Sequence, residues 1–254
     1  IEEREEFEPL VEQGIVVYAG IDYRKILSEA EKEADVIIWD GGNNDTPFYK
    51  PDLHIVLFDP HRAGHELLYF PGETNMIMAD IAVINKVDSA PAQKVWQVRK
   101  NIEEYAPGAQ IVMAESSLVV KKPEMIQGKR VLVIEDGPTL THGEMPFGAG
   151  IVAAEAFNAA EIIDPRPYAV GSLNETYTVY PHIGNVIPAM GYTPDQISDL
   201  ENTINHAECD LVLFATPIHL PLVLDIQKPT LRVRYEYQDH GQRTLEELIT
   251  GRLT

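Results

Sequence analysis

The chain has 254 residues, of which 44% are hydrophobic, and this is enough for the core of one large α/β domain or two small ones. Its 20 basic and 40 acidic side chains give a formal net charge of −20, which disfavours binding to nucleic acid and to anionic membranes. No segment approaches the ~20 consecutive apolar residues that span a bilayer. We therefore expect no nucleic-acid partner and no membrane partner.

The single cysteine and the first residue give two further expectations. Cys209 cannot form an internal disulfide and lies beside an apolar run, so we interpret it as buried packing in a reducing, cytoplasmic compartment. The chain begins with Ile1 rather than Met, which suggests that an upstream part of the same polypeptide is a partner of this segment. Whether the chain forms a homo-oligomer is left open.

Short apolar runs alternate with amphipathic stretches, a pattern that predicts parallel strands joined by crossover helices. In the first half we expect strands at 15–19, 36–39, 53–58, 81–84 and 110–114, and helices over 22–33 and 91–105. After Lys121-Lys122-Pro123 we expect strands at 131–134, 161–163, 185–189, 211–215 and 230–237, and helices over 150–158, 195–207 and 244–249. We predict two α/β domains, residues 1–120 and 121–254.

The apolar run Val36–Trp39 is followed by Asp40 and two glycines, which is the form of a Walker B strand. An Asp at the carboxyl end of a parallel strand lies where ligands bind, and it can hold Mg²⁺ directly or through water. We predict that Asp40 is a catalytic residue and a metal ligand. The alternative is a strand-end turn in which Asp40 only accepts hydrogen bonds from local N–H groups.

Polar loops follow the next predicted strands. Arg62, in the loop after 53–58, is a candidate for clamping a phosphate, with a surface ion pair to Glu66 as the alternative. Asn85-Lys86-Val87-Asp88 follows 81–84, and an Asn-Lys-x-Asp loop at a strand end is the guanine-binding element of P-loop GTPases. Ser116, after 110–114, is a candidate for a backbone contact to the base. A plain polar turn is the alternative for the whole Asn-Lys-x-Asp loop.

A phosphate-binding loop of the form Gly-x-x-x-x-Gly-Lys-Ser/Thr has no match in the chain. With base-binding and metal-binding elements but no phosphate loop, the first domain is predicted to be a parallel-sheet P-loop NTPase-like core that is truncated at its N-terminus. The residues that hold the phosphates are then expected upstream of Ile1.

The polar, glycine-rich segment 139–150 precedes a predicted helix, whose free N–H groups and positive dipole end favour anions. We expect a phosphate, sulfate or carboxylate near Gly148 and Gly150, within reach of His142 or Arg166. For His142, a hydrogen bond that braces the loop is the alternative to a catalytic role. Residues 148–153 also fit the looser Gly-x-Gly-x-x-Ala dinucleotide pattern, but too many residues separate them from the preceding strand.

A family resemblance brings these motifs together. The segments 40–52, 59–66 and 71–75, the Asn85–Asp88 loop, and the second-half segments 135–143, 145–150, 164–168 and 188–192 resemble the predicted P-loop GTPases related to cyclic 2,3-diphosphoglycerate synthetase. The resemblance covers the whole chain as the C-terminal portion of such a protein. It implies a nucleotide-dependent enzyme whose relatives close the two phosphates of 2,3-diphosphoglycerate into an internal anhydride.

The expected function is therefore that of a GTPase-like P-loop enzyme that uses Mg²⁺ and GTP or ATP and acts on a small phosphorylated metabolite. Its expected catalytic residues are Asp40, Arg62 and His142. The expected cofactor-binding residues are Asn85, Lys86, Asp88, Ser116, Gly148, Gly150 and Arg166. The alternatives are a non-catalytic nucleotide-sensing or assembly module and a dinucleotide-binding enzyme that uses the 148–153 loop.

Overall fold

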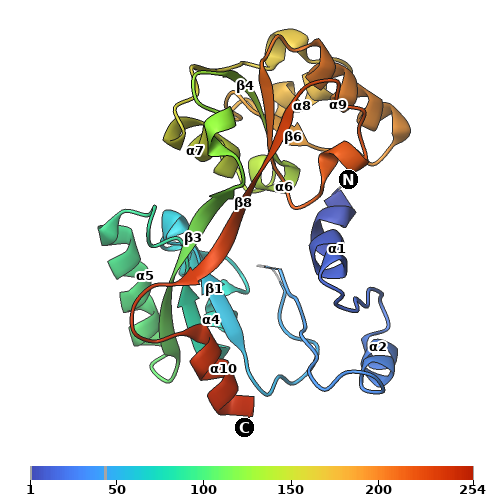
Figure 1. Cartoon of the computed structure of the whole chain (residues 1–254). Coiled ribbons are helices and arrows are strands. Elements are labelled where there is room, and N and C mark those ends of the chain that lie inside the picture. Colours follow the sequence, from blue (N-terminus) through green and yellow to red (C-terminus); the bar gives the residue numbers. More distant parts are fainter. Residues whose placement is uncertain (1, 43–44, 254) are drawn as a thin grey trace. The chain divides into compact units, whose positions relative to one another are not determined.

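The structure is a computed structural model that describes residues 2–42 and 45–253, with the side chains of 7–42 and 45–252. It divides into two compact units, each formed by two stretches of the chain (Figure 1). Unit 1 comprises Ile1–Val17 and Leu118–Tyr235, and unit 2 comprises Tyr18–Ser117 and Glu236–Thr254. The chain passes from one unit to the other after Val17, within strand β3 and within strand β8, so neither unit is a continuous half of the sequence.

Unit 2 is built on parallel strands in the order β1-β2-β3. Ile81 of β2 lies in register with Ile55 of β1 on one side and with Gln110 of β3 on the other. The elements of this unit are α2 (Tyr23–Ala30), β1 (Ile55–Phe58), η1 (Pro60–Arg62), α3 (His65–Leu68), α4 (Gly72–Met78), β2 (Ile81–Ile84), α5 (Ala92–Tyr105), most of β3 (Gln110–Val120) and α10 (Leu245–Leu253).

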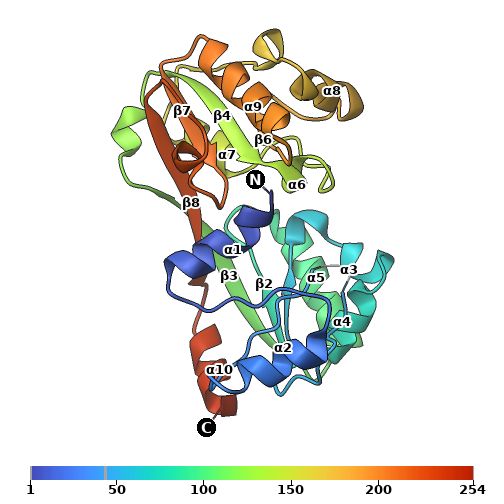
Figure 2. The ribbon, with the colours of Figure 1, turned by 90° about the vertical axis from the view of Figure 1, so that its right-hand side faces the viewer.

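Helices cover both faces of this small sheet (Figure 2). On one face, Met76 of α4 and Ile102 of α5 pack in a buried cluster with Ile84. On the other face, Leu245 and other apolar residues of the C-terminal helix α10 pack against Val83 and its neighbours. The helix predicted over 244–249 is therefore confirmed, and its apolar residues belong to the core of unit 2.

Unit 1 contains a parallel sheet in the order β8-β7-β4-β5, and β6 also pairs with β4. Val131 of β4 lies in register with Leu211 of β7, and Phe214 of β7 with Arg232 of β8. Its elements are α1 (Glu2–Glu12), η2 (Pro123–Met125), β4 (Arg130–Asp136), α6 (Gly137–Leu140), α7 (Ala149–Ala156), β5 (Glu161–Ile162), η3 (Arg166–Tyr168), α8 (Ser172–Val179), β6 (Ile187–Ala189), α9 (Pro194–His206), β7 (Leu211–Ala215), η4 (Leu220–Leu222) and most of β8 (Thr230–Asp239).

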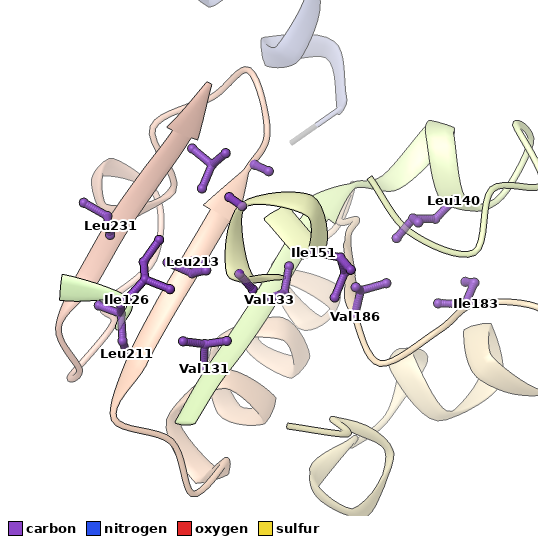
Figure 3. Close-up of a cluster of buried hydrophobic side chains, with 14 residues drawn as sticks. Ile126, Val131, Val133, Leu140, Ile151, Ile183, Val186, Leu211, Leu213 and Leu231 are labelled. Carbon is purple, nitrogen blue, oxygen red and sulfur yellow. The ribbon is translucent and has the colours of Figure 1, made fainter. Parts of the chain in front are cut away.

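Successive residues of β4 and β7 point into different cores. Val133 and Leu213 pack with Ile151 of α7 on one face, as Figure 3 shows. Leu132 and Val212 pack with residues such as Leu200 of α9 on the opposite face. Strands that are buried on both faces read as continuous apolar runs, which is why these runs could be recognised in the sequence.

The α/β class with mostly parallel strands is confirmed, but two expected strands are wrong. Residues 15–19 and 36–39 form neither helix nor strand, and Ile38 is 85% exposed. A strand needs a neighbour to pair with its backbone groups, and no described strand pairs with either segment. A P-loop NTPase core is therefore not confirmed in the part of the chain that the structure describes.

Two smaller expectations concern Cys209 and the membrane. Cys209 is half-buried against the apolar cluster that contains Leu132, and burial raises the pKa of its thiol, as expected for a packing residue. Among the described residues, every helix is too short or too polar to cross a bilayer.

Candidate functional site

The carboxyl ends of β1, β2 and β3 meet at one edge of the unit 2 sheet, and the loops that follow them carry most of the polar residues singled out by the motifs. Asp59 follows β1, and Asn85 follows β2. Ser116 lies within β3, which runs on past the point expected from the sequence. Ligands of open parallel sheets bind outside this edge, so the position favours a functional site.

An ion pair joins the first two of these loops. The Lys86 ammonium lies 2.8 Å from the Asp59 carboxylate, and both side chains are only partly exposed. Burial raises the pKa of Asp59, but the hydrogen bond and charge of Lys86, together with the backbone N–H of His61, outweigh it, so the net pKa is lowered. Asp59 therefore stays ionised and holds the ammonium at the sheet edge.

Ser116 ties the second and third strands together at the same edge. The amide Nδ2 of Asn85 donates to the Ser116 hydroxyl at 3.3 Å. The carboxylate of Asp88 accepts from the Ser116 backbone N–H, also at 3.3 Å. The structure therefore brings together Asn85, Lys86, Asp88 and Ser116, as the loop interpretation expects, although Asn85 and Asp88 here contact the protein itself.

Lys86 adopts a left-handed backbone conformation with φ of 57°, which places its peptide groups within the turn. Its N–H donates to the Asn85 side chain at 2.9 Å, and its carbonyl accepts from the backbone N–H of Ala90 at 3.0 Å. A non-glycine residue in this region costs free energy and is more common at functional sites than elsewhere.

The motifs did not single out three further residues at this edge. His61 Nε2 lies 3.0 Å from the Ser89 hydroxyl, and the Lys94 ammonium donates to the His61 carbonyl at 3.0 Å. Two ammonium groups and an imidazole therefore gather here in a chain whose net charge is −20. The run Asp59-Pro-His-Arg after a strand was the available signal for His61, whereas Lys94 reads in the sequence as an ordinary helical residue.

The remaining first-half candidates lie on different kinds of segment. Arg62 is the last residue of η1, directly after His61, and is partly buried. Asp40 is exposed and lies in a segment without helix or strand, so the expected Walker B strand is absent. The motif 40–45 includes residues 43 and 44, which lie outside the described residues.

In unit 1, the N–H groups expected to bind an anion already hold a carboxylate. Glu135, near the end of β4, is 2% exposed and accepts hydrogen bonds of 3.1 Å from the backbone N–H groups of Gly148 and Ile151. Gly150 contributes a third N–H. An external anion at this helix start would have to displace Glu135, because the protein fills the site with its own side chain.

The two glycines are needed because Glu135 and Val133 lie so close. A Cβ on Gly148 would lie 2.7 Å from Glu135 Oε2, and one on Gly150 would lie 2.6 Å from Val133 Cγ1. Burial raises the pKa of Glu135 to about 7, although the N–H groups of Ile151, Gly150 and Gly148 favour its ionised form. Close packing on Glu135 thus accounts for the Gly-x-Gly-x-x-Ala pattern without a dinucleotide.

His142 and Arg166 take part in local contacts. His142 is exposed, and its Nδ1 lies 3.1 Å from the hydroxyl of Thr141. The Arg166 guanidinium donates to Asp164 at 2.9 Å and to the Ile183 carbonyl, and lies over the ring of Tyr177 at 5.2 Å from its centroid. The contact of His142 matches its bracing alternative, and the expected anion-binding role of both residues stays a prediction.

No group of three or more His, Cys, Asp or Glu side chains suited to a metal ion occurs among the described residues. Mg²⁺ often uses only one or two protein carboxylates and takes its other ligands from phosphates and water. The expected role of Asp40 as a metal ligand therefore also stays a prediction.

Comparison with known proteins gives a relative of a different kind from the one expected. A search against family models finds no match. The chain is 59% identical over 249 residues, 98% of its length, to arginine synthetase ArcE of Thermococcus kodakarensis strain ATCC BAA-918 / JCM 12380 / KOD1. The match covers 56% of that protein. The chain thus spans about half the length of the curated relative.

This finding corrects the family resemblance. At 59% identity, the relative is named an arginine synthetase, not a P-loop GTPase related to cyclic 2,3-diphosphoglycerate synthetase. The expected GTPase-like function, resembling that of cyclic 2,3-diphosphoglycerate synthetase, is therefore wrong, and the relative gives no support for the use of GTP. The resemblance relied on short polar motifs at strand ends, and such positions carry polar residues in ligand-binding α/β sheets of many functions.

Proposed function

We propose that this chain is part of an enzyme that forms arginine at the expense of ATP, and that the edge of the unit 2 sheet binds the nucleotide. The identity of 59% over 98% of the chain with a protein named arginine synthetase supports the reaction class. The Lys86–Asp59 ion pair at the carboxyl end of three parallel strands is the structural observation that supports the place.

The charge distribution favours this edge for a polyphosphate. A net charge of −20 repels ATP unless cations are concentrated at one place. Lys86 and Lys94 provide two ammonium groups within this network, and His61 adds an imidazole. When a phosphate oxygen replaces the Asp59 carboxylate as the partner of Lys86, one charge-assisted hydrogen bond is exchanged for another.

A synthetase needs ATP because forming a carbon–nitrogen bond in water is unfavourable. Transfer of a phosphoryl group turns a poor oxygen leaving group into a good one, which an amine then displaces. Mg²⁺ bound to the ATP phosphates would offset their charge during this transfer. Among the residues of this chain, Asp40 is the proposed carboxylate partner of the metal, whereas Asp59 is proposed to position Lys86.

The nucleotide site is tested by calorimetric titration of the chain with Mg²⁺-ATP. Lys86→Met should weaken binding at least ~10-fold, because it removes the charge while it keeps most of the stem. Lys32→Met is the matched control, since Lys32 lies in the same unit and pairs with Glu29 at 2.7 Å on the surface. Equal affinities of Lys86→Met, Lys32→Met and the parent chain would contradict this place for ATP.

The reaction is tested with a chimera. This chain replaces the matching segment of the Thermococcus kodakarensis protein, and arginine formation and ATP consumption are measured for the chimera and the parent enzyme. We expect arginine formation within ~10-fold of the parent rate, with Lys86→Met lowering it further and Lys32→Met leaving it unchanged. A folded chimera that consumes ATP without forming arginine would contradict the proposed reaction.

A further inference from the structure

Arg232 of unit 1 has a buried hydrogen-bond donor that is not used. Its guanidinium Nη2 donates to the carbonyl of Pro217, in the loop that follows β7. Its Nε is buried and has no hydrogen-bond partner among the described residues. A buried donor without a partner costs about 1–3 kcal/mol, so an acceptor that reaches this nitrogen would gain what the structure now lacks.

A carboxylate of the protein lies at the same loop. Glu8 of α1 accepts a hydrogen bond of 3.1 Å from the backbone N–H of His219, which is 211 positions away in the sequence. Helix α1 thus lies beside the loop after β7 (Figure 1). The contact attaches the N-terminal helix of the chain to the carboxyl edge of the unit 1 sheet.

The carboxylates that act on Arg232 come from this helix, and a cation comes from its own strand. Burial lowers the pKa of Arg232, and the neighbouring Arg234 lowers it further, while Glu12 and Glu8 raise it. Arg232 lies in register with Phe214, one residue before the end of β7, so its guanidinium reaches the edge where parallel sheets bind ligands. A cationic fork and a loop N–H that already donates to a carboxylate are the donors that a carboxylate ligand requires.

We propose that Arg232 and the backbone N–H of His219 form a carboxylate-binding subsite, which the α-carboxylate of an amino acid takes by displacing Glu8 from the N–H of His219. That the ligand is an amino acid depends on the proposed function. The subsite itself depends only on the contact of Glu8 with His219 and on the bond of Arg232 to Pro217 in the same loop.

A purely structural role for these residues predicts something different. If Glu8 only fastens α1 and Arg232 only braces the loop, Glu8→Gln lowers the free energy of unfolding and leaves ligand binding unchanged. If Glu8 occupies a binding subsite, the same substitution removes a competitor and tightens the binding of carboxylates. The sign of the affinity change therefore distinguishes the two roles.

The test is calorimetric titration of the chain with three probes. L-Arginine carries both a guanidinium and an α-carboxylate, agmatine lacks the carboxylate, and N-acetylglycine lacks the guanidinium. We expect Glu8→Gln to tighten the two carboxylate probes ~10-fold and Arg232→Gln to weaken them at least ~10-fold. Agmatine should bind all variants alike.

Two controls address charge and folding. Glu12→Gln makes the same charge change on α1 without removing the contact to His219, so it measures the effect of charge alone, and it should shift carboxylate affinity less than Glu8→Gln does. Arg232→Lys keeps the charge but loses the planar fork, so it should also weaken the binding of both carboxylate probes. This variant takes the place of Arg232→Gln in the test if Arg232→Gln does not fold. Circular dichroism of each variant establishes that it is folded.

The titrations distinguish a failure of the proposed subsite from a failure of the proposed function. If N-acetylglycine responds to Glu8 and Arg232 substitutions but L-arginine does not bind, the subsite stands and the arginine-forming function is contradicted. If neither carboxylate probe responds to any of these substitutions in folded variants, the subsite is overturned whatever the chimera forms.

Discussion

The carboxylate of Glu135 accepts a hydrogen bond of 3.1 Å from the backbone N–H of Gly148, although both lie where a helix start would otherwise attract an anion from solution. The Glu135 residue is 2% exposed, and its carboxylate also accepts a hydrogen bond from the backbone N–H of Ile151. Because the acceptor comes from within the fold, the polar loop between them need not bind phosphate. The relation also makes the stability of unit 1 depend on pH.

The first prediction concerns that pH dependence. The pKa of Glu135 is raised from 4.5 to about 7 in the folded chain, mainly by burial. Between these values the folded state keeps a proton that the unfolded state has released, so the stabilising contribution is complete below pH 4.5 and is lost as the pH rises through 7. We expect the free energy of unfolding to fall by ~2–3 kcal/mol between pH 5 and 8 from this group.

Urea unfolding at pH 5 and pH 8 measures the effect, and Glu135→Gln is the comparison because it does not titrate. At pH 5 the variant should be close to the parent in stability, because the amide oxygen of Gln can accept the two N–H bonds that the Oε1 of protonated Glu135 accepts. It should lose ~2 kcal/mol less than the parent on going to pH 8. The same loss in both proteins would show that another group causes the pH dependence.

The second prediction concerns the packing on Glu135. Gly150→Ala would place a Cβ 2.6 Å from Val133 Cγ1 and 3.1 Å from Glu135 Oε1, which forces the helix or the strand to move. We expect a loss of ~1–3 kcal/mol in the free energy of unfolding. Gly108→Ala is the matched control, because a Cβ there meets no atom within 4 Å. Equal stabilities of the two variants in urea would contradict the close approach.

The third prediction uses the left-handed backbone of Lys86. Glycine adopts a φ of 57° without the steric cost that a Cβ brings, so Lys86→Gly should be more stable than Lys86→Ala by ~0.5–1 kcal/mol. Both variants lose the ion pair with Asp59, and their difference therefore isolates the backbone term. Elsewhere in a helix or strand the order is reversed. Urea unfolding of the pair gives the difference, and a more stable alanine variant would rule out the left-handed turn in solution.

The strands that could be predicted are those whose partners lie within the described chain. The residue bounds of β2 and β7, Ile81–Ile84 and Leu211–Ala215, agree with the apolar runs seen in the sequence, because both strands are fully buried between two helical layers. The run Val36–Trp39 has the same pattern but no paired neighbour, and Ile38 is exposed. An apolar run reports the capacity to form a buried strand, whereas pairing depends on the other strands present.

The candidate site could be predicted in part for a similar reason. Asn85, Lys86 and Asp88 follow a recognisable strand, so their position at the sheet edge was expected from the sequence. Asp59 as the partner of Lys86 was not, since that pairing depends on which loops the fold brings together. The contact between Glu8 and His219 links opposite ends of the chain, and no local pattern in the sequence signals it.

The last prediction concerns Arg166, which was expected to bind an anion. Its guanidinium donates to Asp164 and to the Ile183 carbonyl and lies over the ring of Tyr177, so its donors already fasten the segment after β5 to the 183–185 region. We expect Arg166→Ala to lower the free energy of unfolding by ~1–3 kcal/mol, since it leaves the Ile183 carbonyl without the guanidinium donor and removes the ion pair with Asp164, which keeps only the backbone N–H of residue 166. Arg99→Ala is the control, because Arg99 forms an exposed pair with Glu103 at 2.9 Å, and such pairs contribute ~0–1 kcal/mol.

The same two variants then separate bracing from binding. A bracing residue changes the midpoint of urea unfolding but leaves the affinity for N-acetylglycine at the parent value, because the carboxylate subsite proposed above uses Arg232 and His219. If Arg166→Ala instead keeps the parent's stability and binds N-acetylglycine at least ~10-fold more weakly, Arg166 is the anion-binding residue that the sequence suggested. Its contacts with Asp164 and Ile183 would then be ones that the ligand replaces, as it is proposed to replace Glu8 at the other arginine.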